Sequence, residues 1–464
     1  MTKIRDVRDV AEHHLCSGCG VCAYIAPDSV TMVDTLIGGR RPLSIVRVVG
    51  HDPAGAEALA ACPGRALAQG PYPAGHLTEL GRAWGPVLEV WEGYAADPEI
   101  RFAGSSGGAA TALSLHCVES EGMHGVLHTA AREDIPYLNH TVMSRSRDEM
   151  LAASGSRYAP ASPCDGLELV ERAPAPCVFV GKPCDVAGAL RASQMRPKLA
   201  DRIGLTIAFF CAGTPTTAGT LEALRTLDIA PEQVASVRYR GRGWPGRFTV
   251  ERGSGERQSL SYEESWGEIL QRHRQWRCMI CPDHTGEFAD ISVGDPWYRK
   301  IEEGEHGSSL ILVRTERGRA MVRSAVDAGV LQIARVSPDY IPRSQPNLLR
   351  TRGSVWGRVA TMRVMGLPVP HFSGLSIFRS WLGLNAHEKL SSTGGTARRI
   401  IERGLSRRVP VKRWVPALVV KSHRNPIIGQ SNVSDRQGVR GRSRDPGCGP
   451  HPPDSARGDS TNRT

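Results

Sequence analysis

Residues 176–192, PCVFVGKPCDVAGALRA, and residues 203–227, IGLTIAFFCAGTPTTAGTLEALRTL, decide the fold. Each stretch begins with a short run of β-branched and aromatic residues, passes through a Gly/Pro turn and continues with the apolar spacing of a helix. The pattern predicts strands at 176–180 and 203–210 and helices at 186–192 and 217–227. Strands that alternate with helices indicate an α/β protein, here with a mixed sheet and flanking helices.

A cysteine follows each of these predicted strands, namely Cys184 and Cys211. The carboxyl ends of strands in an open α/β sheet face the ligand crevice, so we expect both thiols to look into one cleft. Cys278 and Cys281, in CMICPD, would complete a set of four thiolates. A lone C-x-x-C is also compatible with zinc, a redox dithiol or chance, and all four cysteines could simply be buried and unreactive.

A second group of cysteines stands near the N-terminus, in CSGCGVC at 16–22 and in ACPG around Cys62. A [4Fe–4S] cluster takes four thiolates, and C-x2-C-x2-C lets one loop supply three of them while a distant Cys-Pro supplies the fourth. Zinc is the alternative, but structural zinc usually takes two separated C-x-x-C pairs. The spacing therefore predicts an iron–sulfur cluster at Cys16, Cys19, Cys22 and Cys62. We expect the other cysteines to be buried and unreactive (Cys117, Cys164 and Cys177) or part of the tail (Cys448).

Charge is distributed unevenly along the 464 residues, whose 58 Lys and Arg and 47 Asp and Glu give a net charge of +11. Hydrophobic residues at 40% and charged residues at 23% are ordinary for soluble globular proteins, which excludes a membrane bundle. The segment from Arg398 to Thr464 holds 15 Lys and Arg against five Asp and Glu, a net charge of +10. The rest of the chain is nearly neutral, which disfavours nucleic acid as a partner.

The N-terminus lacks the apolar region of a secretory signal, and no apolar run approaches the roughly 18 residues of a spanning helix. We therefore expect a cytoplasmic protein. Cytosolic thiols stay reduced, so the twelve cysteines predict metal or redox chemistry rather than disulfides.

Two loops offer contacts for a cofactor. The first, GSSGG at 104–108, follows a predicted strand at 87–95 and leads into an Ala-rich helix at 109–118. Small residues before a helix leave its first backbone N–H groups open to phosphate, although glycine runs also make plain turns. The second, GRGWPG at 241–246, joins strand-like runs at 235–239 and 247–251, and could hold a planar ring or shield the core. The candidate contacts are Ser105, Ser106, Gly107, Gly108, Gly241, Gly243 and Trp244.

A third place for a cofactor contact is the end of the predicted strand in ADISVGDPW at 289–297, where the candidate residue is Asp295. Its carboxylate could bind a ribityl hydroxyl or cap the next segment, and capping is the commoner role of such a residue.

Taken in order along residues 15–336, the motifs resemble the coenzyme F420 hydrogenase/dehydrogenase beta-subunit family of iron–sulfur flavoproteins, which also includes plant 7-hydroxymethyl chlorophyll a reductase. The matching strings are CSGCGVC with Cys62-Pro63, GSSGGAATAL, VGKPCD, FFCAGTP, YRGRGWPG, CMICPD and ADISVGDPW.

The resemblance implies an oxidoreductase that holds FAD and one or two [4Fe–4S] clusters, with coenzyme F420 as its substrate. It implies an outer, ferredoxin-type cluster at the N-terminal cysteines and an inner cluster at Cys184, Cys211, Cys278 and Cys281. Residues 105–108 and 241–245 look like flavin or coenzyme contacts. Lys182 is our candidate donor near flavin N1, although a solvated turn lysine fits equally well. The resemblance identifies no catalytic side chain.

The expected function is therefore electron transfer between coenzyme F420, or ferredoxin, and a substrate or partner redox subunit. Two alternatives remain: a ferredoxin-dependent small-molecule reductase of the chlorophyll-reductase type, and a non-catalytic relay subunit that binds clusters only.

The C-terminal third has a different pattern, because prolines from Pro338 to Pro370 interrupt it, and we expect an irregular extension. Residues 400–420 are basic and partly amphipathic, which is compatible with an anionic membrane surface or an acidic partner, but Pro410 and Pro416 argue against one helix. The predicted domains are a ferredoxin-type segment (1–85), a flavin/coenzyme domain (86–230), an iron–sulfur/flavin domain (231–345), a basic extension (346–424) and a disordered tail (425–464).

Overall fold

The computed structural model describes residues 4–45, 53–299, 301 and 305–416. The predicted tail at 425–464 lies outside the described residues. The described residues form one compact unit.

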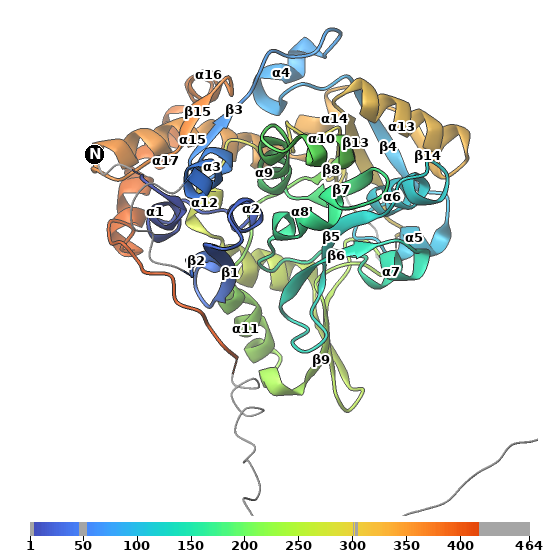
Figure 1. Cartoon of the computed structure of the whole chain (residues 1–464), viewed down its shortest axis with the longest axis horizontal. Coiled ribbons are helices and arrows are strands. Elements are labelled where there is room, and N and C mark those ends of the chain that lie inside the picture. Colours follow the sequence, from blue (N-terminus) through green and yellow to red (C-terminus); the bar gives the residue numbers. More distant parts are fainter. Residues whose placement is uncertain (1–3, 46–52, 300, 302–304, 417–464) are drawn as a thin grey trace, which may run out of the picture. The chain divides into compact units, whose positions relative to one another are not determined.

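An eight-stranded mixed sheet forms the centre of this unit, in the order β14-β4-β13-β12-β8-β7-β5-β6 (Figure 1). Strands β12, β8, β7 and β5 run parallel, and the remaining pairs are antiparallel. The mixed α/β class is confirmed, as are the strands expected within 87–95, 176–180, 203–210 and 289–297. The strands are β4 (Glu89–Ala95), β5 (Val126–Ala131), β6 (Asn139–Ser144), β7 (Cys177–Gly181), β8 (Ile203–Phe209), β12 (Ile291–Gly294), β13 (Ser309–Val313) and β14 (Leu331–Arg335).

Helices cover both faces of the sheet, and the alternation along β7 shows how. Phe179 packs on one face with α8 (Leu167–Glu171) and α9 (Pro183–Ser193). Val178 and Val180 pack on the other face with α6 (Ala109–Glu119) and α13 (Glu316–Asp327). Because successive strand residues point to opposite faces, a fully apolar strand such as β7 must be covered on both sides.

The N-terminal elements pack against the α9 side of the sheet and against helices from the other end of the chain (Figure 1). They are α1 (Val7–Glu12), α2 (Val21–Ile25), the hairpin β1 (Val30–Thr35) and β2 (Gly39–Ser44), α3 (Pro53–Ala61) and β3 (Ala66–Ala68). Val10, Val355 and Ile400 belong to one buried cluster, although nearly 400 residues separate the first from the last.

The prediction of an irregular C-terminal extension is wrong for residues 346–402, because this region is largely helical and packs against the rest of the protein. It comprises α15 (Pro346–Val364), β15 (His371–Ser373), α16 (Ile377–Leu382) and α17 (Ala386–Glu402), and β15 pairs with β3 in parallel. Pro346 occupies the first turn of α15, where its missing N–H costs nothing, so this proline begins a helix rather than breaking one. Residues 403–416 are not helical, which confirms the expectation drawn from Pro410 and Pro416.

A three-stranded antiparallel sheet, in the order β11-β10-β9, lies beside α11 (Thr217–Thr226). Its strands are β9 (Val234–Arg238), β10 (Phe248–Arg252) and β11 (Arg257–Leu260). The central sheet continues across the predicted domain boundary at residue 230. Strands β12, β13 and β14 follow this residue, and they pair with strands that precede it. The remaining helices are α4 (Thr78–Trp84), α5 (Pro98–Ala103), α7 (Arg147–Ala152), α10 (Pro197–Arg202), α12 (Trp276–Met279), α14 (Tyr340–Ser344), and the 3-10 or π turns η1 (Pro163–Gly166), η2 (Pro231–Gln233), η3 (Glu263–Ile269) and η4 (Leu270–His273).

Within the described residues, every helix is too short or too polar to cross a membrane.

Candidate functional site

A cavity of about 300 Å³ lies at the carboxyl ends of the parallel strands. Gly181 ends β7 and Lys182 follows it, Cys211 lies just after β8, and Gly294 ends β12 and is followed by Asp295; all of them line the cavity. This is the edge at which open α/β sheets bind their ligands. Aromatic side chains form part of its wall (Phe209, Phe210, Tyr262, Trp266 and Trp297).

The start of α6 opens into this cavity through Ser105, Ser106 and Gly108. Gly108 has φ +75°, and a Cβ there would lie 2.7 Å from the carbonyl oxygen of Ile100, so only glycine fits. Gly107 does not line the cavity, because its N–H donates to Ser309 Oγ (2.9 Å) on β13.

The lining of this cavity also includes a buried hydroxyl that has no hydrogen-bond partner among the described residues. Ser114, one turn into α6, is 1% exposed, and its Oγ has no hydrogen-bond partner in the described part of the chain. Unpaired buried polar groups are rare, so this hydroxyl fits a polar ligand.

Arg240, whose role no sequence motif indicates, links the start of α6 to Asp295 in the cavity wall. Its guanidinium donates to both oxygens of Asp295 (2.8 and 3.0 Å) and to the carbonyl of Ser105 (2.5 Å). Burial opposes the charged form, but the Asp295 carboxylate outweighs it and raises the pKa of Arg240. The Asp295 carboxylate, which lines the cavity, also accepts from Trp244 Nε1 (2.8 Å), and its contact with a cofactor stays a prediction.

The hairpin loop at 241–246 supports this wall from behind. Trp244 is 2% exposed and stacks on Trp297 with ring centroids 5.5 Å apart. Of the three candidate contacts in the loop, Gly241, Gly243 and Trp244, none lines the cavity. The indole of Trp244 therefore packs behind the cavity lining, and a cofactor contact by this loop stays a prediction.

The four inner cysteines, Cys184, Cys211, Cys278 and Cys281, line a second cavity of about 20 Å³. Burial raises the pKa of Cys211 to about 12, and the neighbouring Cys278 and Cys281 add to the shift. Cys278 Sγ accepts a hydrogen bond from the N–H of Thr214 (3.3 Å). Cys211 and Thr214 line both cavities, so the two adjoin.

The outer cysteines, Cys16, Cys19, Cys22 and Cys62, are also brought together, and all are buried. Burial raises the pKa of Cys62 to about 12, with contributions from Cys19 and Cys16. Cys16 Sγ accepts from the N–H of Gly18 (3.3 Å).

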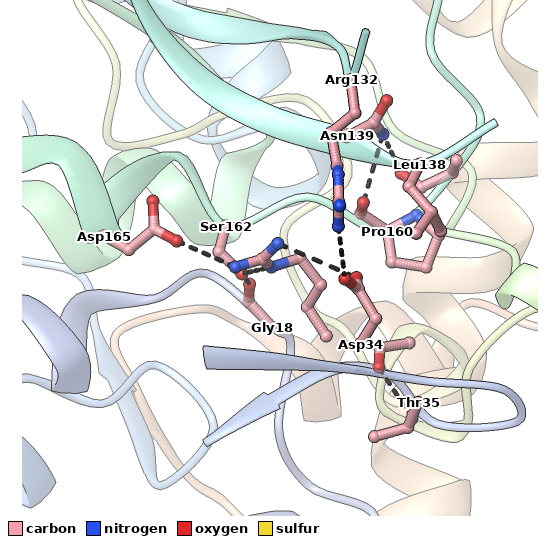
Figure 2. Close-up of polar contacts among 12 residues, drawn as sticks. Gly18, Asp34, Thr35, Arg132, Leu138, Asn139, Pro160, Ser162 and Asp165 are labelled. Carbon is pink, nitrogen blue, oxygen red and sulfur yellow. Dashed lines mark hydrogen bonds and ion pairs between the residues drawn. The ribbon is translucent and has the colours of Figure 1, made fainter. Parts of the chain in front are cut away.

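The outer loop is tied to the body of the protein (Figure 2). Ser162 Oγ donates to the carbonyl of Gly18 (2.7 Å), and Arg40 donates to Ser162 (3.0 Å) and to Asp165 (3.1 Å). Gly20 sits so close to this support that a Cβ would lie 2.8 Å from the backbone nitrogen of Asp165. Protein contacts outside the loop therefore fix its backbone at Gly18 and Gly20.

Two further residues connect the groups, and neither was singled out from the sequence. Burial raises the pKa of both Cys16 and Cys281, and the Arg277 guanidinium opposes this shift at both thiols. Arg277 is 2% exposed and donates to the carbonyl of Pro63 (3.0 Å), so it lies between the two groups. Cys164 is buried, as expected, but it lies beside Cys19, whose pKa it lowers through a hydrogen bond between the thiols.

Lys182 lies between the large cavity and the inner cysteines. Its Nζ is 2.6 Å from Asp185 Oδ2. Burial opposes its charge, but Asp185 and the thiols of Cys184 and Cys211 raise its pKa, so Lys182 is a fixed cation at this boundary.

His284 shares the small cavity with the inner cysteines. Its ring is 5% exposed, and Nδ1 is 2.9 Å from the carbonyl oxygen of Cys211. Burial lowers the pKa of His284 to about 4, and Arg352, Arg358 and Arg274 add to the effect, so the ring is neutral at pH 7.

The donor set of each group fits a [4Fe–4S] cluster. Four thiols gather at each place, buried at the outer site and half-buried at the inner one, a backbone N–H group donates to sulfur in both, and crowded glycines let the outer loop close. Across the described residues, no three His, Cys, Asp or Glu side chains are arranged to hold a single metal ion. A cube with four irons spaces its ligands around its corners instead of converging them on one ion.

Two family models match the chain over just more than half of its length, and both describe the "Coenzyme F420 hydrogenase/dehydrogenase, beta subunit". Residues 90–167 match the model of its N-terminal part, and residues 176–339 match the model of its C terminus. The chain belongs to the coenzyme F420 hydrogenase/dehydrogenase beta-subunit family. The resemblance drawn from the motifs is thereby confirmed.

Known members of this family are similar to the chain over about 60% of its length. The coenzyme F420 hydrogenase subunit beta of Methanococcus voltae is 27% identical over 290 residues, which cover 60% of this chain and 95% of that subunit. The subunit of the same name from Methanothermobacter thermautotrophicus is 23% identical, covering 62% of this chain and 99% of that subunit. A chain of the F420-reducing [NiFe] hydrogenase complex from Methanosarcina barkeri aligns with a TM-score of 0.47 at 21% identity, covering 60% of this chain and 94% of that one.

The family models span all four inner cysteines and most of the lining of the large cavity, but the outer cysteines precede them. The prediction of an outer site therefore rests on its own spacing and geometry.

Proposed function

We propose that this beta-subunit family member is an iron–sulfur flavoprotein that passes electrons between coenzyme F420 and a partner redox subunit. FAD would occupy the large cavity, and [4Fe–4S] clusters would occupy the inner and outer cysteine groups. The observation that carries the proposal is that Cys211 and Thr214 line both the large cavity and the inner cysteine site. Relatives named as beta subunits of coenzyme F420 hydrogenase and of an F420-dependent formate dehydrogenase support the choice of coenzyme and partner.

The walls of the large cavity suit a flavin with a phosphate-bearing tail. Backbone N–H groups at the start of α6 favour a phosphate, and the Ser114 hydroxyl offers a further polar contact. Tyr262 and Trp297 provide flat apolar surface, and Arg240 holds both rings by lying 5.0 Å and 5.4 Å from their centroids. A volume of about 300 Å³ is at the lower end for ligand sites.

A flavin, when bound, takes up two electrons together and releases them singly, which suits a protein that also holds clusters. Lys182 places a fixed positive charge between the flavin cavity and the inner thiols, where it would stabilise added negative charge. Arg277 does the same between the inner and outer thiols. Arg277 is buried and the Lys182 side chain is 21% exposed, so water screens both cations less than it screens surface charges.

Anaerobic purification followed by cofactor analysis tests this proposal. We expect extractable flavin together with iron and acid-labile sulfide, and we expect reduced coenzyme F420 to bleach the flavin within one turnover. Iron without flavin would favour the electron-relay alternative, and bleaching by reduced ferredoxin but not by reduced coenzyme F420 would favour the ferredoxin-dependent reductase.

The inner cluster has its own test in Cys278→Ser. The variant should lose about four iron atoms per chain, the content of one [4Fe–4S] cluster, and keep the iron of the outer site. Cys117→Ser is the control, because Cys117 is a free cysteine outside both cysteine groups, buried in α6 among the apolar residues on the other face of the sheet. Iron content that is unchanged in Cys278→Ser would exclude the inner site.

A further inference from the structure

His284 occupies the small cavity without an assigned role. Cys184, Cys211, Cys278 and Cys281 line the same cavity, so His284 shares this cavity with all four inner cysteines. The position is held tightly on both sides. The N–H of Cys211 donates to the carbonyl of His284 (2.8 Å), and the preceding Asp283 accepts the N–H groups of Thr285, Gly286 and Glu287.

The hydrogen bond at Nδ1 fixes the tautomer of the ring. The partner of Nδ1 is a carbonyl oxygen, which can only accept, so Nδ1 must carry the proton. A neutral imidazole has a single N–H, so Nε2 carries a lone pair. Nε2 is fully buried and has no hydrogen-bond partner among the described residues.

This is the arrangement of a histidine that binds a metal. Ligating histidines almost always donate their other ring N–H to a carboxylate or a backbone carbonyl, which orients the ring and raises its basicity. The alternative, in which Nε2–H donates to a cluster sulfur, would leave the lone pair of Nδ1 facing the carbonyl of Cys211 at 2.9 Å. Two acceptors at that distance repel each other, so ligation is the better account.

The sequence supports the same assignment independently. Cys278, Cys281 and His284 stand three residues apart, in CMICPDH. This is the spacing of Cys16, Cys19 and Cys22 in the outer loop, where one short segment supplies three ligands.

We propose that His284 Nε2 is a protein ligand of the inner iron–sulfur cluster, bound to one iron in place of one of the four thiols. The inference rests on the proposed function, since it requires a cluster at the inner site. Histidine replaces cysteine on iron in some iron–sulfur proteins, where a neutral donor in place of an anionic one raises the reduction potential.

Pulsed EPR of the reduced holoprotein, grown with ¹⁵N-histidine, tests the ligand directly. We expect a strong histidine-nitrogen coupling in the wild-type protein that is absent from His284→Phe and retained in His13→Phe, the control beside the outer loop. In His284→Cys, iron content should be retained, and the reduction potential of the inner cluster should fall.

The wild-type spectrum decides even if His284→Phe fails to assemble. A reduced cluster without histidine-nitrogen coupling overturns the ligand assignment and leaves the proposed function standing. A coupling that persists in His284→Phe also overturns it. Protein that contains no iron overturns both.

Discussion

At the scale of single residues, the buried ion pair of Arg240 and Asp295 organises the wall of the large cavity. The side chains are 3% and 16% exposed, and the pair also holds Trp244 and the backbone of Ser105. Removing one partner of such a pair leaves a charge buried without compensation.

Asp295→Asn should lower the free energy of unfolding by about 3 kcal/mol, the lower end for breaking a buried ion pair, because the amide can still accept one hydrogen bond. Denaturant unfolding measures this. Asp339→Asn is the matched control, since Asp339 pairs with Arg343 at 54–55% exposure, and it should change stability by less than about 1 kcal/mol. Equal effects in the two variants would show that the Arg240 pair contributes no more than a surface pair.

His128 makes a residue-scale prediction about pH. Its ring is buried on β5, Nε2 is 2.7 Å from Ser144 Oγ, and burial lowers its pKa to about 4. The unfolded chain takes up a proton below about pH 6.5, whereas the folded chain resists it until about pH 4. The contribution of His128 to the free energy of unfolding is therefore fully present above pH 6.5. As the pH falls towards 4, this contribution decreases by about 3 kcal/mol.

Replacing the ring with a side chain that does not titrate should remove this part of the acid sensitivity. We expect the free energy of unfolding of His128→Gln to fall less than that of the wild type between pH 6.5 and pH 4.5. His140→Gln, an exposed position on the neighbouring strand β6, should keep the wild-type slope. A wild-type slope in His128→Gln would assign the acid sensitivity to other groups.

Residue types and spacing predicted part of the site from the sequence. The eight cysteines could be grouped because each group has a local signature: three cysteines at fixed spacing, or a cysteine after a strand. Arg240, Arg277 and Cys164 could not, since their roles depend on neighbours brought in by folding: a carboxylate 55 residues away, two separate cysteine groups, and the thiol of Cys19. Trp244 was ambiguous because an indole that shields the core and one that contacts a ligand look identical in sequence.

At the scale of elements, helix α6 depends on the glycine that precedes it. Gly108 caps the helix in the left-handed conformation, and a Cβ would meet the carbonyl oxygen of Ile100 at 2.7 Å and its carbonyl carbon at 3.0 Å. Both contacts are with backbone, so neither can move aside easily.

Gly108→Ala should therefore lower the free energy of unfolding by more than the penalty of about 1–3 kcal/mol for a residue in a strained backbone conformation. It should also shift the start of α6 away from the cavity. Gly255→Ala provides the control, because Gly255 has φ +87° but nothing within 4 Å of its Cβ position. Denaturant unfolding together with flavin content distinguishes the two. If both variants lose the same stability and keep their flavin, crowding at Ile100 plays no part.

The helices at the C-terminus show where element prediction failed. The central strands and helices could be predicted because each one packs a regular pattern of apolar residues against the core and ends at a turn. The predicted ends of β7, β8 and α11 lie within a few residues of the observed ones. Prolines after residue 336 predict breaks, yet Pro346 starts the 19-residue helix α15. The packing of α15 and α17 against the N-terminal segment is a long-range contact that no local pattern encodes.

At the scale of the whole molecule, the C-terminal segment ties the basic end of the chain to the outer cysteine site. Arg408 pairs with Asp9 (2.8 Å) and with Glu12 on α1, Val409 N–H donates to the carbonyl of Glu12 (3.0 Å), and Trp414 N–H donates to the carbonyl of Asp34 (2.8 Å). Part of the net charge of +10 counted beyond Arg398 therefore belongs to the compact unit rather than to an appendage.

Two truncations separate the structural part of this segment from the rest. A chain that ends at Ala417 keeps every contact named above, so its iron content and thermal midpoint should equal those of the full chain. A chain that ends at Ala397 loses Ile400 and Leu405, which are 1% and 6% exposed, together with the Arg408 pairs. Two buried aliphatic side chains contribute about 1.5–3 kcal/mol each. The shorter chain should therefore unfold at lower temperature and lose iron first from the outer site, whose loop follows α1. Equal midpoints and iron contents in the two truncated chains would mean that residues 398–416 lie on the outer site without stabilising it.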